Sequence, residues 1–160
     1  MSTEKYEHER LMRAALAQAE LALAGGEIPV GAVMAVDGEL IAAAHNLREQ
    51  TGDPTAHAEM LVIREAARVL GTRRLNRCTL YVTLEPCPMC AGALSIACVG
   101  GCYFGARDER QGCAESVYAL TRDPAFYHRL PCVGGLLAAE AAALMTRFFE
   151  EKRTKGAPKL

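Results

Sequence analysis

The 160-residue sequence predicts an α/β fold in which a mixed β-sheet lies between two layers of helices. Three observations predict it: a β-hairpin pattern at 30–45, two later apolar runs that alternate with helical segments, and a helical pattern near each end. A hairpin pairs strands antiparallel, whereas strands that alternate with helices are typical of a sheet with helices on both faces. We therefore expect one three-layer α/β/α domain over 1–160, with an ordered core over about 6–153 and a flexible tail over 154–160.

The first part of the chain is predicted to form a helix and a hairpin. Apolar side chains recur at helical spacing over 6–24, and the Gly25-Gly26 pair ends that helix. Residues 30–36 and 39–45 are predicted strands, because the Asp37-Gly38 pair between them is a strong signal for a two-residue hairpin turn. These two strands are therefore expected to pair antiparallel.

The middle of the chain is predicted to alternate between helix and strand. A polar loop over 46–54 precedes a helix over 55–70 that has Thr55 as its N-cap. The apolar run at 79–84 is predicted to be a buried strand, and it leads into a helix that begins at Cys87 and has a proline in its first turn.

The last third of the chain contributes one more predicted strand, over 101–106, and a final helix. A stretch punctuated by Gly, Asp and Pro separates the two. One face of the final helix carries Leu137, Ala141, Leu144 and Phe148. Helices are therefore available for both faces of the sheet.

Composition indicates an ordinary soluble globular protein, with 51% apolar and 23% charged residues. The first residues are charged and lack the apolar core of a signal peptide. The apolar stretch at 134–145 is short and is interrupted by Glu140, so we expect no membrane span and a cytoplasmic location. The net charge of −1 taken alone weakly disfavours a nucleic-acid partner, but basic clusters at 72–77, at 105–110 and in the tail leave the partner open.

Cysteine usage indicates thiol or metal chemistry rather than a disulfide framework. The chain has seven cysteines, which cannot all pair within one molecule. In a reducing compartment, buried thiols, metal ligands or a redox pair are the expected roles.

Two segments carry the candidate chemistry, at 53–60 and at 85–90. Cys87 and Cys90 are separated by three positions at a predicted helix start, so both thiolates can bind one ion close to unpaired backbone N–H groups. His57 lies near the start of another predicted helix and offers a nitrogen ligand. Together these are three ligands of the types that zinc prefers.

Other interpretations of the CxxC pair remain open. The two cysteines suit a redox dithiol or simple packing, although neither explains the His-Ala-Glu segment that begins at His57. A closed structural zinc site is also possible, with a fourth ligand from Cys78, Cys98 or His45.

An open catalytic site is the interpretation that uses both segments. Three protein ligands leave the fourth position of zinc for water, whose pKa the metal lowers toward neutrality. Glu59 can take the proton of that water and later deliver it to the substrate, provided that the metal lies beyond the end of the helix rather than beside it. These groups suit hydrolytic removal of ammonia from an amidine carbon.

The motif His57-Ala58-Glu59 followed by Pro86-Cys87-Pro88-Met89-Cys90 is the known signature of zinc-dependent nucleobase deaminases. The segments "EIPVGAVMAVDGELIAAAHN", "TLYVTLEPCPMCAGAL" and "FGARD" and the final helix resemble those of bacterial tRNA adenosine deaminases, and the similarity covers about residues 6–153.

This resemblance implies a cytidine-deaminase-like fold, a homodimer with one Zn²⁺ per subunit, and conversion of the wobble adenosine of a tRNA anticodon stem-loop to inosine. It implies that the zinc ligands are His57, Cys87 and Cys90 and that Glu59 is the catalytic proton shuttle. The residues that it places at the substrate are Asn46, Asp108, Phe149 and Arg153.

An enzyme of this kind must hold its target base out of the stack, which an anticodon loop makes easier than a duplex does. We expect the base to lie between apolar walls with a few polar contacts. The candidate wall residues are Ile28, Val30, Ala58 and Leu84.

Four positions depart from the family pattern, all of them outside the zinc motif. Ile96 and Cys98 stand where the family usually carries His and Arg, Glu115 replaces a glycine, and Tyr127 replaces an asparagine. The changes fall in three segments: those at 96–98 and at 127 remove polar or cationic groups, and the one at 115 adds a negative charge. They support an alternative substrate, a free nucleobase or nucleoside of the guanine, cytosine or adenosine type.

Overall fold

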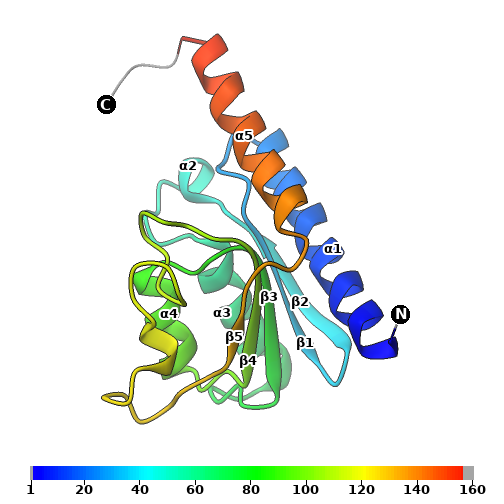
Figure 1. Cartoon of the computed structure of the whole chain (residues 1–160), viewed down its shortest axis with the longest axis vertical. Coiled ribbons are helices and arrows are strands. Elements are labelled where there is room, and N and C mark those ends of the chain that lie inside the picture. Colours follow the sequence, from blue (N-terminus) through cyan, green and yellow to red (C-terminus); the bar gives the residue numbers. More distant parts are fainter. Residues whose placement is uncertain (1, 157–160) are drawn as a thin grey trace.

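The computed structural model describes residues 2–156 and confirms the three-layer α/β/α architecture (Figure 1). Its elements are α1 (Thr3–Ala24), β1 (Gly31–Val36), β2 (Glu39–His45), α2 (Arg48–Thr51), α3 (Ala58–Leu70), β3 (Cys78–Leu84), α4 (Pro88–Ile96), β4 (Gly101–Ala106), the 3₁₀ turn η1 (Leu120–Arg122), β5 (Cys132–Val133) and α5 (Ala138–Thr154). Helices α1 and α5 cover one face of the sheet, and α3 and α4 cover the other (Figure 1).

The sheet is mixed, with strand order β2-β1-β3-β4-β5. Strand β1 pairs antiparallel with β2 and β3, whereas β3, β4 and β5 run parallel. Because of these directions, the end of β2, the start of β1 and the ends of β3 and β4 all lie at one edge of the sheet. Ligand sites of α/β proteins commonly lie outside the carboxyl ends of strands.

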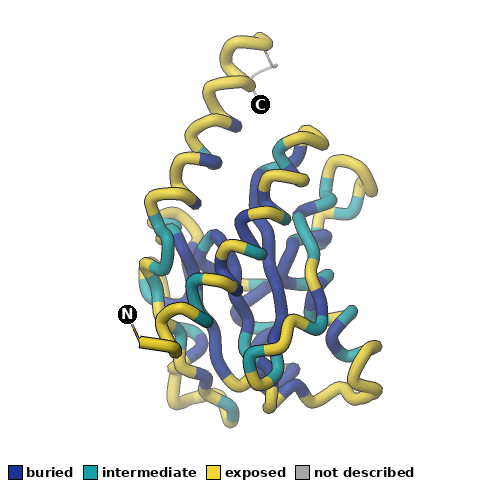
Figure 2. The backbone as a smooth tube through the Cα atoms, turned by 90° about the vertical axis from the view of Figure 1, so that its right-hand side faces the viewer, coloured by how far each residue is buried: buried dark blue, intermediate teal, exposed yellow. Residues whose placement is uncertain are grey.

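Successive side chains of strand β1 pack against the two helix layers in turn. Ala32 and Met34 pack into the core beneath α3 and α4, whereas Val33 and Ala35 pack against α1 and α5. Side chains along a strand point to opposite faces in turn, so a strand covered on both faces is apolar throughout. Strands β1, β3 and β4 are accordingly buried along most of their length, whereas β2, at one side of the sheet, has a single buried residue. The helices are exposed on their outer sides (Figure 2).

The hairpin prediction is confirmed at the turn itself. Asp37 and Gly38 have φ angles of 50° and 79°, so both central residues adopt the left-handed conformation that a type I′ turn requires. Gly38 accommodates this φ without strain because it has no Cβ.

The predicted start of the helix over 55–70, which corresponds to α3, is wrong. The side chain of Asp53 accepts hydrogen bonds from the backbone N–H and the hydroxyl of Thr55, so that Thr55 belongs to a turn before the helix. Helix α3 begins at Ala58, and His57 is its N-cap.

Two predicted irregular segments contain short regular elements. The loop expected at 46–54 includes α2, and the stretch before the final helix includes η1 and β5. In the predicted tail, Thr154 is the last residue of α5, and 157–160 lie outside the described residues.

Helix α5 extends past the sheet edge that holds the ends of β2, β3 and β4 (Figure 1). Its buried residues are Ala141, Leu144 and Phe148, and its last turns are exposed (Figure 2). None of the helices within 2–156 is long and apolar enough to cross a membrane.

Candidate metal centre

The metal-binding side chains lie at two helix starts on the same side of the sheet. His57 is the N-cap of α3, and Cys87 is the N-cap of α4, immediately after β3. Cys90 lies in the first turn of α4, and Pro88 occupies the first helical position, where its missing N–H costs no hydrogen bond. Both helices therefore point their N-termini, with unpaired N–H groups, at one place.

The three ligand atoms are close enough to hold a single ion. His57 Nδ1 lies 3.5 Å from Cys87 Sγ and 3.6 Å from Cys90 Sγ, and all three atoms are within 4.8 Å of one another. Ligands of a tetrahedral zinc ion with bonds of about 2.0–2.3 Å lie roughly 3.3–3.8 Å apart, so this group fits zinc.

The site is an open one. Within 2–156, no further His, Cys, Asp or Glu joins the group formed by His57, Cys87 and Cys90. The closed zinc site with a fourth ligand from Cys78, Cys98 or His45 is therefore not what the structure contains. Three protein ligands leave one position for water or substrate, as in catalytic zinc sites.

The electrostatics of the group favour a thiolate at Cys87. A hydrogen bond from the Cys90 thiol and another from His57 lower the pKa of Cys87 to about 4. The same hydrogen bond, together with burial, raises the pKa of Cys90, and the hydrogen bond to Cys87 raises the pKa of His57. The group thus concentrates negative charge where a cation is to bind.

Glu59 lies next to this group in the first turn of α3. Its side chain is only 4% exposed, and burial raises its pKa to about 7. The carboxyl interacts with the Cys90 side chain, so it is adjacent to the ligands although it does not belong to them. A carboxyl with this pKa can both accept and release a proton near neutral pH.

Asn46 follows β2 at the same edge of the sheet. It is 5% exposed, and its Oδ1 atom is buried without a hydrogen-bond partner among the described residues. Its Nδ2 atom is 3.5 Å from the carbonyl oxygen of Ile28, at the limit of a hydrogen bond. A buried amide oxygen without a partner is costly in an apoprotein and is available to a substrate.

The predicted wall residues lie around this edge. Ala58 and Val30 are buried members of the core cluster beneath α3 and α4, and Leu84 and Ile28 are partly buried against it. Their contact with a base remains a prediction.

The other predicted substrate residues, Asp108, Phe149 and Arg153, lie after β4 and on the last turns of α5. The Asp108 carboxylate accepts hydrogen bonds from the backbone N–H groups of Arg110 (3.0 Å) and Gln111 (3.3 Å), so it caps its own turn after β4. Phe149, which is 47% exposed, and the exposed Arg153 lie on the projecting last turns of α5. Their roles in substrate binding also remain predictions.

Three of the departures from the family pattern lie at and just beyond the end of α4. Cys98 Sγ is 3.7 Å from the Tyr127 hydroxyl, and Ile96, at the end of α4, is two residues before Cys98. Ile96 and Tyr127 are 77% and 84% exposed, which is unusual for large apolar side chains. Ile96 and Tyr127 therefore contribute exposed apolar surface, whereas Cys98 is buried.

The fourth departure, Glu115, is neutralised within the molecule. Its carboxylate forms an ion pair with Arg107 at 3.1 Å. The negative charge that the sequence adds near a possible polyanion is therefore matched by a cation.

Two buried glutamates were missed by the sequence analysis. Glu27 is fully buried and accepts hydrogen bonds from the backbone N–H groups of Glu49 and Gln50, at the start of α2. Glu85 is 2% exposed and binds the segment after β4. The sequence could have indicated them, because each glutamate lies in an otherwise apolar stretch. A carboxylate buried there needs several hydrogen-bond donors around it.

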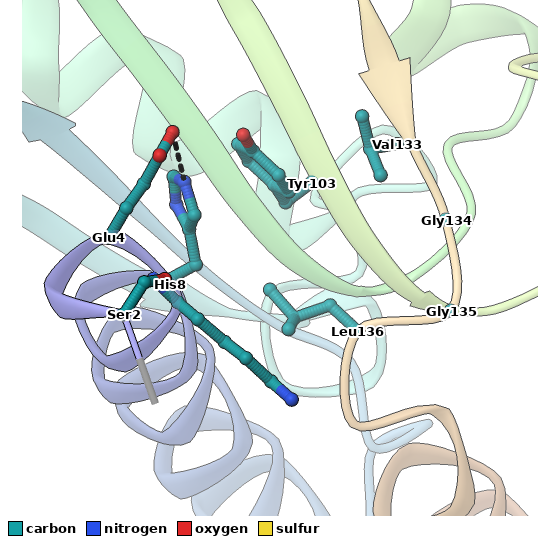
Figure 3. Close-up of a pocket in the computed structure, with 9 residues that line it drawn as sticks. Ser2, Glu4, His8, Tyr103, Val133, Gly134, Gly135 and Leu136 are labelled. Atoms are coloured by element: carbon teal, nitrogen blue, oxygen red, sulfur yellow. Dashed lines mark hydrogen bonds and ion pairs between the residues drawn. The ribbon is translucent and has the colours of Figure 1, made fainter.

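A separate hollow of about 370 Å³ lies between the start of α1 and strands β4 and β5 (Figure 3). Its lining residues are Ser2, Glu4, Lys5, His8, Tyr103, Val133, Gly134, Gly135 and Leu136. None of these belongs to the metal centre, so the hollow is distinct from the candidate site.

Comparisons with known proteins agree with this geometry. Residues 5–106 match the family model "Cytidine and deoxycytidylate deaminase zinc-binding region". The tRNA-specific adenosine deaminase of Bacillus subtilis (strain 168) is 48% identical over 147 residues, which cover 92% of this chain and 91% of that protein.

Two solved structures share the fold. One, from studies of A-to-I editing by tRNA:A34 deaminases at the wobble position, has a TM-score of 0.81 and 41% identity, covering 84% of this chain and 98% of the other. The guanine deaminase of Bacillus subtilis has a TM-score of 0.59 and 38% identity, covering 67% of this chain and 66% of the other. The likeness to the first structure is thus the more extensive.

Proposed function

Because this chain belongs to the cytidine and deoxycytidylate deaminase family, among relatives named tRNA-specific adenosine deaminase, we propose that it deaminates adenosine to inosine at the wobble position of a tRNA anticodon. The observation that carries the proposal is the open group of His57, Cys87 and Cys90 with the buried Glu59 beside it. The near-complete coverage of the A34 deaminase structure favours tRNA over a free base as substrate. We place this activity in the cytoplasm.

His57, Cys87 and Cys90 would hold the zinc ion, which would supply Lewis acidity that lowers the pKa of a water molecule in the site. Glu59 would transfer the two protons of the water one after the other, the first to N1 of the purine ring and the second to the departing amine. Its pKa of about 7 allows the same carboxyl to serve as base and then as acid. Attack at C6 of adenine and loss of ammonia give hypoxanthine, the base of inosine.

Asn46 is proposed to orient the target nucleoside. Its buried Oδ1 atom lacks a partner among the described residues, and its amide can donate a hydrogen bond as well as accept one. Val30, Ala58 and Leu84 would then form the apolar walls, with Asp108 near a flanking nucleotide. We also propose that Phe149 and Arg153, which are exposed on the projecting end of α5, contact the RNA outside the pocket.

The substrate assignment predicts which compound releases ammonia. With an anticodon stem-loop, free adenosine, guanine and cytidine offered in parallel to the zinc-loaded protein, we expect turnover only with the stem-loop. Binding of the stem-loop should also weaken about tenfold or more between roughly 0.05 and 0.2 M salt, because RNA binding releases counterions.

A stem-loop with guanosine at the wobble position serves as the matched control and should release no ammonia. Turnover of guanine, cytidine or free adenosine at a higher kcat/KM than that of the stem-loop would contradict the assignment and establish the alternative substrate class.

We further propose that the protein is a homodimer whose interface uses the apolar surface at the end of α4. Tyr127 contacts Cys98 beyond that helix end, and Tyr118 and Phe126 line a common hollow beside it. The exposed fractions of Ile96, Tyr118 and Tyr127 are 77%, 70% and 84%. An apolar patch of this kind marks an interaction surface, and a second copy would cover it.

The substitution Tyr127→Glu should therefore convert the dimer to a monomer, because it places a charge in an apolar interface. Light scattering coupled to size-exclusion chromatography measures the mass directly. Leu21→Glu is the matched control, since Leu21 is 55% exposed on α1, on the other side of the sheet. A wild-type monomer, or a dimer that survives Tyr127→Glu, would contradict the proposed interface.

A further inference from the structure

The carboxylate of Glu85 organises the segment that follows β4. One oxygen, Oε1, accepts a hydrogen bond from the backbone N–H of Asp108 at 3.1 Å and from the hydroxyl of Ser116. The other oxygen, Oε2, accepts bonds from three successive N–H groups, of Ala114 (3.2 Å), Glu115 (2.9 Å) and Ser116 (2.9 Å). A single side chain thus binds both ends of the segment 108–116, which we call the 108–116 loop.

Gly112 shows how closely the loop encloses this carboxylate. A Cβ atom at Gly112 would lie 2.3 Å from Cδ of Glu85 and 2.5 Å from its Oε1 atom, so no larger residue fits. The φ angle of Gly112 is not in the left-handed region, so the reason for glycine here is close approach rather than backbone conformation.

The same loop is tied to the zinc-binding segment. The backbone N–H of Cys113 donates a 2.8 Å hydrogen bond to the carbonyl oxygen of Pro86, and Cys87 is the next residue. Three successive residues therefore have related roles: Glu85 binds the loop through its side chain, Pro86 binds it through its carbonyl oxygen, and Cys87 is a metal ligand. The position of the loop relative to the metal centre is therefore fixed over a very short stretch of chain.

We propose that Glu85 is a positioning residue for substrate, which holds the 108–116 loop, with Asp108, at the mouth of the metal centre. The inference rests on the proposed function, in which Asp108 meets a nucleotide that flanks the target. Glu85 itself does not take part in the reaction, since its two oxygens are occupied by backbone and hydroxyl donors. Its loss should therefore affect RNA binding far more than the chemical step.

The variant Glu85→Gln tests this role in the full-length, zinc-loaded protein. An amide has one oxygen in place of two, so some of the five donors lose their acceptor, while the size of the side chain is kept. We expect KM for the anticodon stem-loop to rise about tenfold and kcat to stay within about twofold, with zinc content unchanged. Amide hydrogen exchange of residues 108–116 should become faster.

Two further variants complete the design. Ser116→Ala removes only the hydroxyl donor and keeps the buried carboxylate, so it should raise KM in the same direction but less. It also decides the question if Glu85→Gln does not fold. Glu109→Gln is the matched control, because Glu109 is exposed in the same loop, and it should leave KM and hydrogen exchange unchanged.

Four outcomes would contradict the role proposed for Glu85 or the function on which it rests. A large fall in kcat or a loss of zinc in folded Glu85→Gln would overturn the proposal, because Glu85 would then support the metal centre itself. Faster loop exchange with an unchanged KM would overturn it too. If the wild-type protein does not deaminate the stem-loop, the proposed function fails, while unchanged loop exchange in both variants would show that Glu85 does not hold the loop.

Discussion

Replacing Glu59 with alanine is expected to lower kcat about 10³- to 10⁴-fold, because general acid–base catalysis by a positioned carboxyl contributes on this order. Glu59 is the one carboxyl among the described residues that is both buried and in contact with a predicted metal ligand, and burial raises its pKa to about 7. Without it, no side chain beside the ligands can take the proton of the attacking water. Ammonia release from the stem-loop measures the rate, and metal analysis should still find one zinc per chain.

Glu59→Gln distinguishes loss of proton transfer from loss of packing. The amide has nearly the volume of the carboxylic acid, so it avoids the cavity that alanine leaves at this buried position. We expect the same fall in kcat for both variants, with a melting temperature closer to wild type for Glu59→Gln. Turnover within about tenfold of wild type in either variant would show that another group moves the proton.

The parts of the fold that the sequence predicts correctly are those with local signals. The Asp37-Gly38 pair specifies its turn through backbone conformation alone, so the hairpin follows from two residues. The proline after Cys87 likewise marks a helix start by its own geometry. The metal centre could be predicted because its ligand spacing repeats a chemistry that zinc requires, at helix starts that the sequence already indicates.

What the sequence does not predict depends on contacts between distant residues. Helix α2 begins where Glu27 accepts the N–H groups of Glu49 and Gln50, about twenty residues away in the chain. Strand β5 has only two residues, and its pairing with β4 rather than its own composition defines it. The start of α3 differs from the prediction because Asp53 binds Thr55, a side-chain contact that competes with capping.

The consequences of the four departures from the family pattern also could not be predicted from the sequence alone. From the sequence, Glu115 appears to add a negative charge that would repel RNA, whereas the structure pairs it with Arg107. Tyr127 and Cys98 appear as two separate losses of polar groups, whereas their side chains contact each other. Such compensation cannot be seen without knowing which residues meet.

Replacing the ligand Cys87 with alanine is expected to remove both the metal and the activity. Two ligands, His57 and Cys90, would remain, and two protein ligands do not make the three-ligand site that a catalytic zinc requires. We expect zinc content to fall to background and ammonia release to drop by about 10³-fold or more, since the metal supplies several kcal/mol of transition-state stabilisation. The melting temperature should fall as well, because an ion that binds only the folded chain stabilises it.

Cys132→Ser is the matched control for this prediction. Cys132 is partly buried on β5 and is not part of the group that can hold a metal, so the variant should keep its zinc and its activity. Cys87→Ser keeps a side chain of similar size but offers oxygen instead of a thiolate, and it should bind zinc more weakly than wild type and more tightly than Cys87→Ala. Stoichiometric zinc and wild-type turnover in Cys87→Ala would mean that other groups hold the ion. Loss of activity in Cys132→Ser would mean that replacing a cysteine outside the metal group also disturbs the protein. The ligand assignment would then need a test on the unaltered chain. Absorption spectroscopy of the cobalt-substituted wild-type protein is such a test, because thiolate ligands give intense absorption bands.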